Sequence, residues 1–83
     1  MFSILVHRKA LREIDNLPAE DKQRILSILR EMAADPFSGD VKRTKGTKAV
    51  LRRRIGDYRV AFTVNFEKAE LVVLRVGRRE KFY

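Results

Sequence analysis

Residues 50–76 read VLRRRIGDYRVAFTVNFEKAELVVLRV, and this stretch decides the fold because it predicts three consecutive β-strands. Gly56-Asp57 interrupts the first run of apolar and basic residues, and such a pair suits the tight turn of a hairpin. Residues 67–69 provide a second polar turn. The predicted strands, which pair as an antiparallel meander, are 50–55, 58–66 and 70–76.

Side chains along these strands are expected to alternate between the two faces of the sheet. The inward positions are predicted to be Leu51, Ile55, the even residues from 58 to 66, Val72, Leu74 and Val76. The outward positions are then Arg52, Arg54, Arg59, Leu71, Val73 and Arg75. Arg53 takes an inward position that the alternation does not explain, and its long side chain is expected to extend to an edge.

Upstream of the meander, the apolar spacing changes to that of helices. Residues 2–7 predict a short strand, whereas the stripes Ala10, Leu11, Ile14, Leu17 and Ile25, Ile28, Leu29, Met32 predict two helices. The helices are expected at about 8–17 and 19–34, because Leu17-Pro18 and Asp35-Pro36 each end a helical run. Residues 37–48 are assigned to loops.

The predicted fold class is α+β in a single domain, residues 1–83. An N-terminal strand and a helical hairpin precede the meander, which forms a small curved sheet with the helices on one face. The absence of cysteine excludes disulfides and thiolate metal sites. Without a signal-like segment or a long apolar run, a soluble cytoplasmic protein that does not bind membranes is expected, either as a monomer or within a small complex.

The net charge of +8 is concentrated in two segments of the chain. Residues 42–59 contain eight basic side chains and one acid, and residues 75–83 contain four basic side chains and one acid. Such a concentrated positive field is typical of proteins that bind a polyanion, most often nucleic acid. A single histidine, His7, excludes a two-histidine ribonuclease, and the scarcity of acids disfavours a two-metal site. No cofactor or metal is therefore expected.

Several arginines are predicted to gather on the sheet face opposite the helices. Arg52 and Arg54 leave that side of one strand, Arg59 leaves the same side of its partner, and Arg75 and Arg79 follow on the next strand. The planar guanidinium group forms bidentate contacts with phosphate oxygens, so this face is a candidate phosphate cradle. Two interpretations stay open for the basic residues of the preceding loop, either a solvated surface or a patch that steers nucleic acid: Lys42, Arg43, Lys45 and Lys48.

Three segments carry a resemblance to a known family: ALREIDNLP, LRRRIGDYRVAFTV and LVVLRVGRREKFY. Together with the order of elements, they resemble the RelE/ParE superfamily of toxins from type II toxin–antitoxin systems. The RelE-like branch cleaves messenger RNA in the ribosomal decoding site, whereas the ParE-like branch inhibits DNA gyrase. The resemblance favours the RelE-like branch and implies a cognate acidic antitoxin, with the ribosome and mRNA as further partners. Many relatives have histidine where this chain has Arg78.

The resemblance also implies a metal-independent mechanism in which the ribose 2′-OH attacks its own phosphate. The products are a 2′,3′-cyclic phosphate and a 5′-OH end. Arg54 and Arg59 would hold the phosphate oxygens, Tyr83 would accept the proton, and Arg79 would act as an electrophile. The remaining RNA-binding candidates are Arg52, Lys45, Lys48, Arg75, Arg78 and Lys81, with Lys81 as a competing proton donor.

Two other functions are compatible with the sequence. One is a ParE-like protein that binds and inhibits gyrase without cleaving RNA. The other is an inactive module that binds RNA or the ribosome. Three residues near the candidate site have structural interpretations: Tyr58 in the core, Asp57 in the turn, and His7 as a bystander at a strand end.

Overall fold

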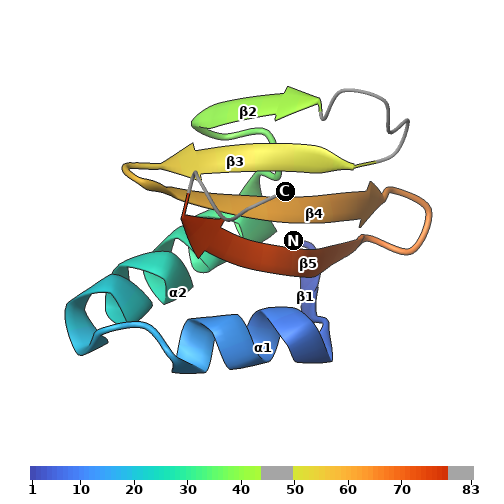
Figure 1. Ribbon diagram of the computed structural model, residues 1–83. Helices are drawn as coiled ribbons and strands as arrows, with labels where there is room; N and C mark the ends of the chain where they lie inside the picture. Colours follow the sequence, from blue (N-terminus) through green and yellow to red (C-terminus); the bar gives the residue numbers. More distant parts are fainter. Residues whose placement is uncertain (44–49, 79–83) are drawn as a thin grey trace.

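The computed structural model describes residues 1–43 and 50–78 (Figure 1). Their helices and strands follow one another as β1 (Ser3–Val6), α1 (Arg8–Asp15), α2 (Ala19–Ala34), β2 (Asp40–Arg43), β3 (Leu51–Ile55), β4 (Tyr58–Asn65) and β5 (Glu70–Arg78). The predicted α+β class is confirmed. The first helix ends two residues earlier than expected, with Asn16 as its C-cap.

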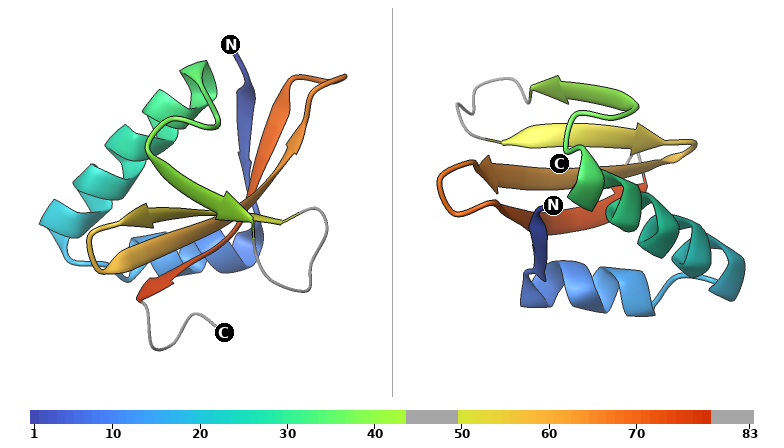
Figure 2. Two further views of the ribbon diagram at one scale, coloured as in Figure 1. Left: turned by 90° about the horizontal axis from the view of Figure 1, so that it is seen from above. Right: turned by 180° about the vertical axis from the view of Figure 1, so that it is seen from behind.

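The described strands form one mixed sheet in the order β1-β5-β4-β3-β2. β3, β4 and β5 are the predicted antiparallel meander, whereas β1 adds in parallel to the outer edge of β5. Gly56 has a φ of 60° in the turn between β3 and β4, a conformation that favours glycine. α2 crosses one face of the sheet and α1 lies along its β5 side (Figure 2). No described helix covers the opposite face.

β2 (Asp40–Arg43) is a strand where the sequence predicted a loop, and the loop assignment was wrong. It pairs with β3 in antiparallel register, with Asp40 opposite Arg54 and Lys42 opposite Arg52. Val41 is half-buried and packs against the core, while its neighbours are exposed. A four-residue edge strand with one apolar residue has too little periodicity to be predicted from its sequence. Backbone pairing with β3 holds it in place.

β5 contains an irregularity that reverses part of the predicted alternation. Ala61 lies opposite Arg75, but Phe62 lies opposite Val73, so Leu74 is an extra residue in the ladder. Leu71 and Val73 are therefore fully buried, and the prediction that Val72 and Leu74 face the core was wrong. Beyond the bulge, Val76 faces the core as predicted.

The core fills the space between the sheet and the two described helices. Its fully or almost fully buried members include Ala10 and Ile14 from α1, Ile25, Leu29 and Met32 from α2, and Val60, Phe62, Leu71 and Val73 from the sheet. Leu11 was predicted to join them but is 50% exposed. Neither of the two described helices, α1 and α2, is long and apolar enough to cross a membrane.

Candidate functional site

Strand pairing brings basic side chains together on the sheet face opposite the helices. Arg54 lies between Asp40 of β2 and Arg59 of β4, and Arg52 lies beside Lys42. These five described residues line a pocket of about 90 Å³. As expected from the alternation, Arg52, Arg54 and Arg59 are on the same face.

The size of this basic pocket restricts what it can hold. One water molecule occupies about 30 Å³ in the liquid, so a pocket of about 90 Å³ has room for a group of a few heavy atoms. Pockets that enclose whole small molecules are several times larger, roughly 300–1,000 Å³. The hollow lined by the described residues is therefore in the size range of a small anion such as a phosphate group.

The charges around the pocket are unbalanced. Four cationic side chains and one carboxylate, Asp40, are its described lining. Arg54 and Arg59 lie directly opposite each other, an arrangement that destabilises neighbouring strands by repulsion. Within residues 1–43 and 50–78, no carboxylate forms an ion pair with Arg54 or Arg59. An anion bound between them would relieve this repulsion.

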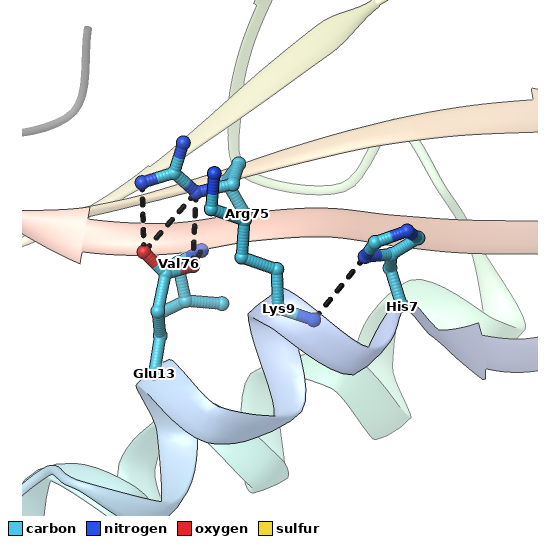
Figure 3. A network of polar contacts seen from close by, with 5 residues as sticks. All are labelled: His7, Lys9, Glu13, Arg75 and Val76. Atoms are coloured by element: carbon cyan, nitrogen blue, oxygen red, sulfur yellow. Dashed lines mark hydrogen bonds and ion pairs between the residues drawn. The ribbon is translucent and has the colours of Figure 1, made fainter.

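Arg75 lies on the same face but its guanidinium is occupied. It is opposite Ala61 in the register, and its Nε and Nη2 donate to the carboxylate of Glu13 in α1 at 2.9–3.1 Å (Figure 3). Glu13 also accepts a hydrogen bond from the backbone N–H of Val76 at 2.9 Å. The bond with Glu13 raises the pKa of Arg75. Arg75 thus joins α1 to β5 and does not line the basic pocket.

Arg78 lies on the other face of the sheet. It is opposite Tyr58 in the register, and its guanidinium carbon is 5.5 Å from the centre of the Tyr58 ring. Tyr58 is buried, which confirms its predicted place in the core, and its hydroxyl donates to Asp21 Oδ2 at 2.8 Å. Arg78 therefore covers the end of the core, on the helix side of the sheet.

Five predicted site residues lie outside the described residues: Lys45, Lys48, Arg79, Lys81 and Tyr83. The described part of the candidate site is therefore the part that the sequence predicted to hold phosphate. The residues expected to transfer protons, Arg79 and Tyr83, stay predictions.

Sequence reasoning missed Asp40 as part of this site and left Lys42 between two interpretations. The one signal for both in the sequence is the polar–apolar–polar alternation of Asp40, Val41 and Lys42, which is too short to predict a strand by itself. This pattern places the two charges on one face of a strand and the valine on the other.

A larger hollow, of about 540 Å³, lies at the start of α1 and is lined by His7, Arg8, Lys9 and Arg12. His7 caps the helix there, with Nδ1 accepting from the N–H of Lys9 at 3.2 Å, a structural role that the sequence interpretation did not include. The lining side chains are exposed and come from a single helix and its cap. The smaller basic pocket is the better candidate for a phosphate site, because three paired strands hold its side chains in register.

Comparisons with known proteins agree with this fold. The model of the ParE toxin family, described as toxins of the type II toxin–antitoxin system parDE, matches residues 4–83. The RelE1 protein of Methanocaldococcus jannaschii is 27% identical over 99% of this chain and 94% of its own length.

Solved structures of RelE proteins have a similar fold. RelE in the archaeal RelE–RelB complex from Pyrococcus horikoshii is 25% identical, with a TM-score of 0.81, covering 96% of this chain and 97% of that one. The isolated RelE toxin of E. coli has a TM-score of 0.82 at 22% identity, over 98% and 87% of the two chains, and shares the fold. With a family match that spans almost all of its sequence, the chain belongs to the ParE toxin family of type II toxin–antitoxin systems, within the RelE/ParE superfamily.

Proposed function

We propose that this protein is a ribosome-dependent mRNA endonuclease of the RelE type that inhibits translation. The observation that carries the proposal is the basic pocket, in which the facing guanidinium groups of Arg54 and Arg59 leave room for one phosphate. The similarity to RelE proteins favours this branch of the superfamily.

In the proposed reaction, the ribose 2′-OH attacks the adjacent phosphorus and the 5′-oxygen leaves. The products are a 2′,3′-cyclic phosphate and a 5′-OH end. Arg54 and Arg59 stabilise the charge that builds on the non-bridging oxygens, and Arg52 and Lys42 add to the positive field. Tyr83 would take the proton from the 2′-OH, and Arg79 would act as an electrophile that stabilises the negative charge on the leaving 5′-oxygen. That oxygen would then take a proton from Lys81, the competing donor, or from water.

Cleavage is expected to depend on the ribosome, because the proposed set of side chains contains no histidine. Arginine is a poor proton donor at neutral pH, and tyrosine has an ordinary pKa of about 10. The ribosome would supply the in-line geometry that these weak acid–base groups require. Ribosome and mRNA are therefore the proposed working partners.

An acidic antitoxin is the proposed regulatory partner. RelE of P. horikoshii was solved in complex with RelB. Here the sheet face that carries the basic pocket is not covered by a described helix, and β2 is an edge strand. A partly disordered acidic chain that folds on this face would neutralise it and exclude RNA.

The test uses purified protein, ribosomes stalled on a defined mRNA, and mapping of both cut ends. We expect cuts within the decoding site with cyclic phosphate and 5′-OH ends. Arg59→Leu should reduce the cleavage rate on the order of a hundredfold, as for loss of one oxyanion donor. Arg30→Ala, which removes an exposed arginine of α2, is the matched control and should leave the rate unchanged.

A second function competes because the matching family model is named for ParE. A gyrase inhibitor of this type would block DNA supercoiling and leave mRNA intact. Supercoiling assays with the same preparation separate the two functions. Inhibition of gyrase that survives Arg59→Leu, without any mRNA cutting, would replace the endonuclease proposal.

A further inference from the structure

Arg53 is the one charged residue among the buried residues that the structure describes, with 7% of its surface exposed. It lies on the helix-facing side of β3, between Leu51 and Ile55. Burying a charge is costly unless the charge is paired and hydrogen-bonded. No carboxylate of residues 1–43 or 50–78 forms an ion pair with it. Arg53 therefore needs an explanation other than charge pairing.

The guanidinium of Arg53 binds the segment between α2 and β2. Its Nη1 donates to the backbone oxygen of Ser38 at 2.6 Å and to Ser38 Oγ at 3.2 Å. Its Nε is buried and has no hydrogen-bond partner in the described structure. This incomplete set of hydrogen bonds gives little net stability, because a buried donor without a partner opposes folding.

Gly39 leaves room for the same guanidinium group, because it has no side chain. Its φ is +77°, and a Cβ there would lie 2.4–2.7 Å from Cζ, Nη2 and Nε of Arg53. Any side chain at residue 39 would therefore displace the guanidinium in addition to straining the backbone. The preceding turn is fixed as well, since Asp35 accepts from the N–H groups of Phe37 and Ser38. The contacts of Ser38 and Gly39 with Arg53 thus hold the α2–β2 segment in place on the helix side of the sheet.

The α2–β2 segment leads directly into β2, the strand that completes the basic pocket. Gly39 precedes Asp40, and Arg53 itself is the register partner of Val41. β2 is short and at the sheet edge, so pairing with β3 alone holds it weakly. Arg53 holds the start of β2 from the helix-facing side of the sheet, while Asp40 and Lys42 line the pocket on the other face.

We propose that Arg53 is a positioning residue for phosphate binding, which holds β2 in place through Ser38 and Gly39 and so sets the β2 wall of the basic pocket. Arg53 does not contact the RNA itself. This inference rests on the proposed RNA-binding function, but its effect on β2 can be measured without RNA.

The first measurement is amide hydrogen exchange of the free protein. In Arg53→Leu, the leucine joins Leu51 and Ile55 on the core side, so the fold should persist. The amides of residues 40–43 should then exchange on the order of tenfold faster or more, while those of β4 keep their protection. Arg53→Lys retains a donor for the Ser38 oxygen and should restore part of the protection.

The second measurement is the affinity for a short oligouridylate at several salt concentrations. Each direct phosphate contact to a single strand adds about 0.7 to the slope of log affinity against log salt. Arg54→Leu and Arg59→Leu should weaken binding and lower this slope. Arg53→Leu should weaken binding severalfold with the slope unchanged, because β2 is held less firmly in position while the direct phosphate contacts are kept.

Gly39→Ala provides a second route to the same result and covers the case in which Arg53→Leu does not fold. Its Cβ should expel the guanidinium and reproduce both effects. A reduced slope in Arg53→Leu would make Arg53 a direct contact and overturn the inference. So would unchanged exchange of residues 40–43 in the folded variants. If Arg54→Leu and Arg59→Leu also bind normally, the proposed function fails, whatever β2 does.

Discussion

At the scale of single residues, three consecutive arginines show how position decides the role of a charge. Arg52 and Arg54 project to the open face of β3 and line the basic pocket, whereas Arg53 projects to the helix side and binds Ser38. Arg75, on the open face of β5, is neutralised by Glu13. Positive charge in the sequence therefore identifies candidates, and the local partner of each guanidinium determines which can hold a phosphate.

The pair of Glu13 and Arg75 makes a prediction at this scale. Glu13→Gln should lower the free energy of unfolding by about 1–2 kcal/mol, because it weakens charged hydrogen bonds to Arg75 and Val76 that are only partly shielded from solvent. For a domain of this size the melting temperature should fall by roughly 4–8 °C per kcal/mol. Thermal unfolding followed by circular dichroism measures the change.

The control for this substitution is Glu31→Gln, at an exposed position of α2, which should change the melting temperature little. Glu13→Gln also releases Arg75 on the open face, so affinity for oligouridylate should stay the same or increase. A variant with wild-type stability, or one that loses RNA affinity while folded, would show that Glu13 does not act mainly on Arg75 and β5.

At the scale of elements, the apolar pattern was sufficient to predict a segment where its apolar residues recur at the spacing of one buried face. The stripe from Ile25 to Met32 predicted α2, and the even positions of β4 predicted its buried face. β2 could not be predicted in this way, because Val41 is its one apolar residue and its pairing uses the backbone. Accordingly, the Arg54–Arg59 half of the pocket was foreseeable, and the Asp40–Lys42 half was not.

The bulge in β5 escaped prediction for a related reason. Residues 71–74 are all apolar, so their pattern is compatible with either register. The choice depends on packing against β4 and the helices, which buries Leu71 and Val73. It also depends on Glu13, which holds Val76 and Arg75 just beyond the extra residue.

The bulge predicts that both deletion and truncation are tolerated at residue 74. Deleting Leu74 removes the extra residue, so the pairs Phe62–Val73 and Ala61–Arg75 follow each other in a regular ladder and the buried side chains of β5 keep their face. This variant should still fold. Leu74→Ala keeps the bulge and removes a half-buried side chain, so it should cost less than about 2 kcal/mol. Urea unfolding of both variants tests this, and a deletion variant that cannot fold would contradict the assigned register.

At the scale of the whole molecule, the folded state holds cationic side chains close together in the basic pocket, although they repel one another. The chain carries a net charge of +8, and Arg54 and Arg59 face each other on paired strands. Such strain is expected at functional sites, where binding of a ligand relieves it. A ligand that binds only the folded protein also stabilises it in proportion to the logarithm of its concentration.

Inorganic phosphate should therefore stabilise the free protein. At a phosphate concentration ten times its dissociation constant, the gain is about 1.4 kcal/mol. The melting temperature should then rise by roughly 6–11 °C for a domain of this size. The comparison is made at constant ionic strength, with chloride replacing phosphate, so that general screening of the charges is the same in both.

Phosphate also stabilises proteins non-specifically through its exclusion from their surface, so the variants decide this test. Arg54→Leu and Arg59→Leu should melt higher than the parent protein in chloride, because the facing charges are gone, and should gain less from phosphate. Arg30→Ala should respond to phosphate as the parent does. An equal gain in all four proteins would mean that the pocket does not bind phosphate and that the facing arginines serve another purpose.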